Sequence, residues 1–224
     1  IIKTIDEYDE HGRFATKTTN PVGQISEAKY DPKWGTPLMQ KGVDGLITTY
    51  VYDAFGKLTK MKTPDGLETN YSINWAIGTT VNGIGTVPLT GLIYFSSIQR
   101  DGSPSDITWF DIYGRGIKNQ TDGFNEPVYS VKLYNAKGQL EISTAPFFDG
   151  DIPEIKTYLY ETSGVKTGLL KSTSSSLDGV ITYNYTNPST GLFKTSITNP
   201  SGQNSSQTSD AADKVISADD DNGT

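Results

Sequence analysis

A Tyr-Asp pattern that reaches glycine three or four residues after the aspartate recurs along the chain. It starts at Tyr8, Tyr30 and Tyr52, with 22 residues between successive tyrosines. It returns at Phe110 and Tyr134, and looser copies start at Tyr160 and Tyr185, at spacings of 24, 26 and 25 residues. A worn last copy covers Ser209–Val215. Self-similarity at such a period predicts an array of stacked supersecondary units. The residues that define the pattern are Tyr8, Asp9, Gly12, Arg13, Tyr30, Asp31, Gly35, Tyr52, Asp53, Gly56, Phe110, Asp111, Gly114, Arg115, Tyr134 and Gly138.

Each copy carries a second turn signal seven or more residues after the first. These signals are Asn20–Gly23, Gly42–Gly45, Thr63–Gly66 and Asn199–Gly202, with Asp122-Gly123, Asp149-Gly150, Asp178-Gly179 and Asn222-Gly223 as later relatives. An aspartate that opens a turn accepts a hydrogen bond from the backbone two residues on, and glycine supplies the positive φ that closes a hairpin. The repeating unit is therefore expected to be turn, strand, turn, strand.

Between the turns the residues alternate as in strands. Tyr50 and Tyr52 share one face of such a strand, and the pairs at 158 and 160 and at 183 and 185 repeat this spacing. We expect all six tyrosines to be largely buried between repeats. Apolar residues at helical spacing are absent, and the 23 glycines and 11 prolines interrupt most long windows. The sequence predicts an all-β fold, a ribbon of short antiparallel strands built from hairpin repeats of 22–26 residues.

The whole chain, 1–224, is expected to be a single repeat array. Residues 1–76 hold three repeats, 77–108 an elaborated repeat or insertion, 109–210 four further repeats and 211–224 a truncated one. Strands are expected at 92–98 and 107–110, joined by an Asp101-Gly102 turn. Both ends cut into the pattern, so we interpret the chain as a piece of a longer polypeptide.

Composition and charge exclude several functions. The chain has no cysteine, which removes disulfides, thiolate zinc sites and cysteine nucleophiles. A formal net charge of −7 and a pI near 4.7 make nucleic acid and anionic membranes poor partners. No apolar run approaches the ~20 residues of a membrane span.

The Tyr-Asp-x-x-Gly-Arg pattern with its Pro-Asp-Gly type of second turn resembles the RHS, or YD, repeat. The resemblance covers roughly residues 5–224. It implies a long β-sheet ribbon that spirals into a hollow shell, often around a C-terminal toxin, as in bacterial polymorphic toxins, the shell subunits of insecticidal toxin complexes and animal teneurins. The family's self-cleavage sequence of the Asp-Pro-x-Gly-Leu type is missing, because Asp31-Pro32-Lys33-Trp34-Gly35 has an extra residue and no leucine.

The resemblance implies a structural shell or scaffold segment of a large exported bacterial protein, secreted or at the cell surface. Its partners would be neighbouring repeats and an enclosed C-terminal toxin domain. The alternative is a carbohydrate- or cell-surface-binding module, in which the tyrosine rows would form a platform for surface glycans. We expect no enzyme, no cofactor and no metal site.

The candidate chemical residues have structural explanations. His11 is the sole histidine and is expected to be exposed in a turn. The aspartates at 9, 31, 53 and 111 occupy equivalent places in successive copies, which predicts turn capping rather than one convergent carboxylate pair. The run from Asp219 to Asn222 lacks the glutamate that would complete a calcium loop.

Overall fold

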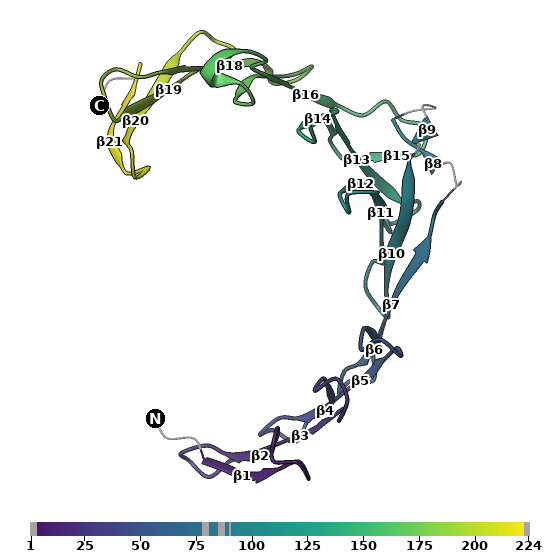
Figure 1. Cartoon of the computed structure of the whole chain (residues 1–224). Coiled ribbons are helices and arrows are strands. Elements are labelled where there is room, and N and C mark those ends of the chain that lie inside the picture. Colours follow the sequence, from purple (N-terminus) through teal and green to yellow (C-terminus); the bar gives the residue numbers. More distant parts are fainter. Residues whose placement is uncertain (1–3, 78–80, 85–87, 90, 222–224) are drawn as a thin grey trace. The chain divides into compact units, whose positions relative to one another are not determined.

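The computed structural model describes residues 4–77, 81–84, 88–89 and 91–221 and confirms the all-β prediction. Nineteen strands belong to one antiparallel sheet, and β8 (Val81–Asn82) and β9 (Pro88–Leu89) form a two-stranded sheet of their own. The longest helical element in the described part is a single 3-10 turn, η1 (Gly164–Lys166). The strands follow the chain as successive hairpins (Figure 1).

The chain divides into two compact units. The strands of the first unit are β1 (Thr4–Tyr8), β2 (Ala15–Thr19), β3 (Ile25–Tyr30), β4 (Pro37–Lys41), β5 (Ile47–Tyr52), β6 (Leu58–Lys62), β7 (Glu68–Trp75), β10 (Leu92–Arg100) and β11 (Asp106–Asp111). From β1 to β7 each strand pairs with the next in the chain, and β7 then pairs with β10. The two strands expected around Asp101-Gly102 are confirmed as β10 and β11, and Gly102 has a φ of +67°.

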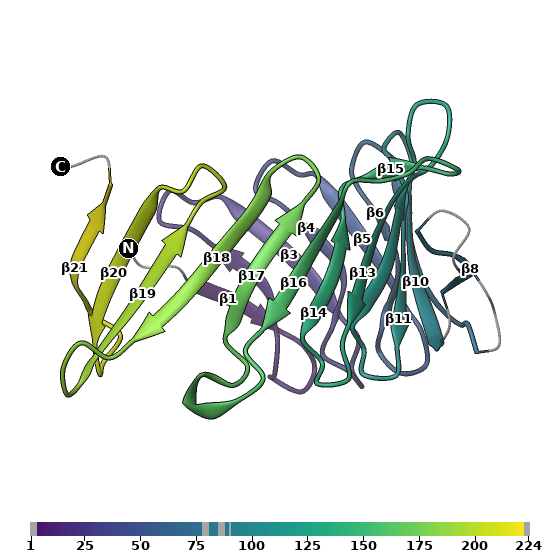
Figure 2. The ribbon, with the colours of Figure 1, turned by 90° about the horizontal axis from the view of Figure 1, so that it is seen from above.

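The second unit contains the C-terminal hairpins. Besides β8 and β9, its strands are β13 (Val128–Tyr134), β14 (Leu140–Thr144), β15 (Phe147–Phe148), β16 (Ile155–Tyr160), β17 (Leu170–Ser175), β18 (Gly179–Thr186), β19 (Leu192–Thr198), β20 (Asn204–Asp210) and β21 (Val215–Asp220). Their turns alternate between the two edges of the ribbon (Figure 2). One strand, β12 (Gly116–Thr121), has residues in both units.

Few apolar side chains in the described part are buried. They are Ala76, Leu89, Leu92, Val131, Phe147 and Tyr185. The prediction that six tyrosines of the strands are largely buried is therefore wrong for five of them, which are half-buried, and correct for Tyr185 alone. The reason is geometric: neighbouring strands cover the flanks of a side chain that stands up from a sheet, and only a second layer would cover its tip.

Candidate functional site: the row of Tyr-Asp turns

The aspartate of each Tyr-Asp copy organises the turn that follows it. At Asp53, the backbone N–H donates to the carbonyl of Lys57 (2.9 Å), and Gly56 donates back to the Asp53 carbonyl (3.1 Å). The carboxylate Oδ1 accepts the N–H of Phe55 (2.9 Å) and of Lys57 (3.0 Å). Gly56 has a φ of +80°, which side-chain-bearing residues rarely adopt. The turn is therefore closed by one carboxylate and one glycine.

Related networks recur at the copies that start at Tyr8, Tyr30, Phe110 and Tyr134. The predicted positive φ of the turn glycines is confirmed at Gly12, Gly35, Gly56, Gly114 and Gly138. Asparagine replaces aspartate in the Asn135 turn, and also in the opposite-edge turns that begin at Asn20 and Asn199. The worn last copy keeps the network with Asp210 as acceptor, and Asp213 occupies the glycine place with a φ of +60°. The Asn222-Gly223 turn signal lies outside the described residues.

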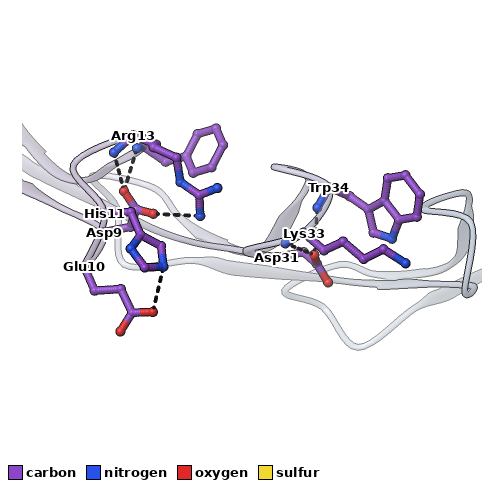
Figure 3. Close-up of polar contacts among 8 residues, drawn as sticks. Asp9, Glu10, His11, Arg13, Asp31, Lys33 and Trp34 are labelled. Carbon is purple, nitrogen blue, oxygen red and sulfur yellow. Dashed lines mark hydrogen bonds and ion pairs between the residues drawn. The ribbon is translucent and has the colours of Figure 1, made fainter.

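The first two Tyr-Asp turns are one residue longer than the Asp53 turn. Figure 3 shows the contacts that the Asp9 and Asp31 carboxylates make within these two turns. The N–H of Asp9 donates to the Phe14 carbonyl at 2.9 Å, and that of Asp31 donates to the Thr36 carbonyl at 2.8 Å. In the first turn His11 lies on the surface, with its Nε2 3.2 Å from Glu10 Oε1. The expectation that His11 is an exposed turn residue is confirmed.

Asp111 is the most buried aspartate of the Tyr-Asp pattern, with 6% of its surface exposed. Its Oδ1 accepts the N–H groups of Tyr113 and Arg115, both at 2.9 Å, and its Oδ2 lies 2.7 Å from Arg115 Nε and 2.6 Å from Nη2. Burial alone would raise the pKa of the Asp111 carboxyl, but hydrogen bonds and charge from Arg115 outweigh it and hold the pKa below 3.8. The side chain of Arg115 therefore contacts the aspartate of its own turn.

Three tyrosines of the pattern each tie a repeat to the strand before it. Tyr52 Oη donates to the carbonyl of Pro37 at 2.9 Å, and Pro37 begins the neighbouring strand β4. Equivalent hydrogen bonds join Tyr160 to Leu140 (2.9 Å) and Tyr185 to Leu170 (2.8 Å). Burial raises the pKa of all three phenols above 10.0, so each remains a protonated donor at neutral pH.

We predict that Tyr52→Phe lowers the free energy of unfolding by about 1 kcal/mol, because the Pro37 carbonyl loses its donor. Tyr50→Phe is the matched control: it removes a hydroxyl on the same strand that donates to the exposed Gln40 side chain. Urea unfolding of the two variants checks this. Equal losses would show that the tie to Pro37 adds nothing.

Aromatic residues of one turn pack against the glycine of the next, which the sequence pattern did not indicate. A Cβ on Gly35 would lie 2.7 Å from Phe14 Cζ, and a Cβ on Gly56 would lie 2.8 Å from the Trp34 ring. Cations cover other ring faces: Lys33 Nζ lies 4.4 Å from the Trp34 ring centroid. Trp34 therefore lies between a lysine and the next turn.

Residues 4–77, 81–84, 88–89 and 91–221 contain no group of three or more histidine, cysteine, aspartate or glutamate side chains placed to hold a metal ion. Asp219 and Asp220 of the acidic tail are residues of strand β21. Among the described residues no helix is long and apolar enough to cross a membrane.

Comparison with known proteins agrees with the repeat geometry. Residues 40–68 match the RHS Repeat family, and they contain the Asp53 turn. No curated protein matches the chain.

One solved structure shows the same fold. A crystal structure of TcdB2-TccC3 is similar over 97% of this chain, with a TM-score of 0.62 and 11% sequence identity. A crystal structure of TcdB2-TccC3-TEV matches 93% of the chain at 18% identity, with a TM-score of 0.46. The chain spans only 14% and 12% of the lengths of these two proteins. The match at residues 40–68 and the recurring Tyr-Asp turns agree on the RHS repeat, and the likeness to TcdB2-TccC3 shows the same fold.

Proposed function

We propose that the chain is a non-catalytic scaffold segment of a large exported RHS-repeat protein, secreted or held at a bacterial cell surface. The observation that carries the proposal is where the signature groups of the repeat make their hydrogen bonds. The Asp53 carboxylate is used within its own turn, and the Tyr52 hydroxyl is used on the preceding strand. Side chains that make these hydrogen bonds stabilise the turns and connect neighbouring strands of the array. They do not converge on one point where a substrate could react.

In this proposal residues 1–224 are one continuous array, and the motif residues serve as structural links between its repeats. The likeness in fold to part of TcdB2-TccC3 supports a wall segment of a shell. The partners are then neighbouring repeats of the same polypeptide and a C-terminal toxin domain that the shell encloses. The acidic surface, with a net charge of −7, supports a role away from nucleic acid and anionic lipid.

Glycan binding is the competing function, and its support is the exposed ring of Phe55, which is 83% accessible. Sugar platforms need ring faces that are open to a ligand. Two other rings of the turn row each have a cation nearby: Lys33 lies over Trp34, and Arg115 Cζ lies 4.9 Å from the Tyr113 ring centroid, although Tyr113 is 78% accessible.

A glycan array tests the two functions. The scaffold proposal expects no selective binding of the 224-residue chain above background. Selective binding that is lost in Phe55→Ala, but kept in the apolar control variant Val22→Ala on the opposite-edge turn, would replace the scaffold proposal with a glycan-binding module.

A further inference from the structure

An apolar recess in the second unit lies beside an insertion between two paired strands. β14 and β16 pair directly, with Thr144 opposite Ile155, and the ten-residue segment 145–154 is inserted between them. Ordinary turns of this chain are much shorter. In the Asp53 turn, the backbone N–H of Asp53 already donates to the carbonyl of Lys57, four residues later. The insertion folds back, so that Phe148 of β15 pairs with Val128 of β13 (Figure 2).

The insertion has a defined structure. The N–H of Ala145 donates to the carbonyl of Glu154 at 2.9 Å, and the N–H of Asp151 donates to the carbonyl of Phe148 at 3.1 Å. Phe147 is buried against Tyr129, with ring centroids 6.0 Å apart. This leaves a preformed recess of about 570 Å³ beside the insertion.

Apolar side chains line the recess but remain open to solvent. Ile152 is 93% exposed and Leu177, from the turn between β17 and β18, is 79% exposed; Phe148 is also exposed. Grouped exposed apolar residues around a concavity mark binding surfaces, whereas isolated ones need no explanation. Val165 is an isolated example in the same unit, fully exposed and outside the recess.

The charges around the recess are all of one sign. The described residues that line it include Asp151 and Glu154 and no base. Glu154 Oε1 is buried and has no hydrogen-bond partner in the described part of the chain. Lys118 does not line the recess; it is buried, with its Nζ 4.1 Å from the Tyr129 ring centroid. A buried carboxylate oxygen without a donor destabilises the free chain. The acidic lining as a whole favours a cationic ligand.

We propose that this recess binds a segment of another polypeptide in which one arginine or lysine is flanked by apolar residues. The basic group approaches the carboxylates of Glu154 and Asp151, which line the recess, while its apolar neighbours cover Ile152 and Leu177. An anionic membrane surface does not fit, because the acidic rim repels it. The proposal does not depend on the scaffold function, since it concerns an insertion and not the repeat motif.

The test is fluorescence anisotropy of the 224-residue chain with two labelled peptides, Gly-Leu-Arg-Leu-Gly and Gly-Leu-Glu-Leu-Gly. We expect the arginine peptide to bind and the glutamate peptide not to bind. Glu154→Gln should weaken binding about tenfold, and the double variant Ile152→Ser, Leu177→Ser by a similar factor. The controls Glu161→Gln and Val165→Ser should bind as the parent chain does. Equal binding of both peptides, no binding of either, or unchanged binding in the Glu154 and Ile152/Leu177 variants would overturn the proposal.

A second measurement needs no peptide. Glu154→Gln should raise the melting temperature of the free chain. It replaces a charged carboxylate, whose Oε1 is buried without a donor, with a neutral amide. A lower melting temperature would mean that Glu154 serves the fold, and the site would be abandoned. Binding to phosphatidylserine vesicles in place of the arginine peptide would also overturn the proposal.

Discussion

Gly56→Ala is expected to destabilise the chain by about 3 kcal/mol, the sum of a backbone cost and a packing cost. The φ of +80° at this position costs a residue with a side chain about 1–2 kcal/mol. The new Cβ would also lie 2.8 Å from the Trp34 ring, which must move away from the turn and so disturbs its contact with Lys33. Urea unfolding followed by tryptophan fluorescence measures both the loss of stability and the displacement of Trp34.

Gly66→Ala is the matched control, because Gly66 has a φ of +89° and a Cβ added there would meet no atom within 4 Å. It should cost about 1–2 kcal/mol, the backbone share alone. The reciprocal change Asp213→Gly should stabilise the chain, since Asp213 already carries that strain at φ +60°. Equal losses in Gly56→Ala and Gly66→Ala would show that the packing of Trp34 on the next turn contributes nothing to stability.

The turns could be predicted from the sequence because their chemistry is local. Asp53 and Gly56 lie three residues apart, and the hydrogen bonds that they make stay within the same few residues. The repeat period could be predicted for the same reason, and it indicated the hairpin order of the strands. Asp213 shows the limit of the pattern: an aspartate takes the glycine conformation in a copy where the motif is worn.

Contacts between repeats could not be predicted in the same way. The Tyr52 hydroxyl reaches the carbonyl of Pro37, 15 residues earlier, and that choice depends on strand register rather than on residue type. The packing of Trp34 on Gly56 depends on the extra residue in the Asp31 turn, which the sequence shows but does not place.

The later copies depart further from the local pattern. After Tyr160 the turn expands into a loop with the 3-10 turn η1, closed by a hydrogen bond from Gly168 to the Glu161 carbonyl at 2.8 Å. The recess beside residues 145–154 was not foreseen either, because its walls come from segments about 25 residues apart in the chain. An apolar cluster within a turn-rich stretch is the one sequence signal that could have indicated it.

Asp111→Ala is expected to cost about 3 kcal/mol, because it removes a buried acceptor that serves two backbone donors and one guanidinium. Tyr113 N–H and Arg115 N–H both donate to Asp111 Oδ1. Asp53→Ala is the matched control. It removes the equivalent aspartate from the turn of another repeat, where the site is exposed, and should cost about 1 kcal/mol. Chemical denaturation at neutral pH compares the two. A loss at Asp111 no larger than at Asp53 would mean that burial and the arginine contact add nothing to the turn.

The pH dependence separates the charge of Asp111 from its hydrogen bonds. Asp111→Asn keeps an Oδ1 acceptor, as Asn135 does in its own turn, but loses the charge that Arg115 contacts. The pKa of Asp111 is lower in the folded chain than in the unfolded one, so its charge stabilises the fold above the usual carboxyl pKa of 3.8. That contribution disappears as the pH falls through the lowered folded value. The stability difference between the parent chain and Asp111→Asn should therefore be largest near neutral pH and shrink from about pH 5 to about pH 2. A difference that stays constant over this range would assign the whole effect to hydrogen-bond geometry and none to the ion pair with Arg115.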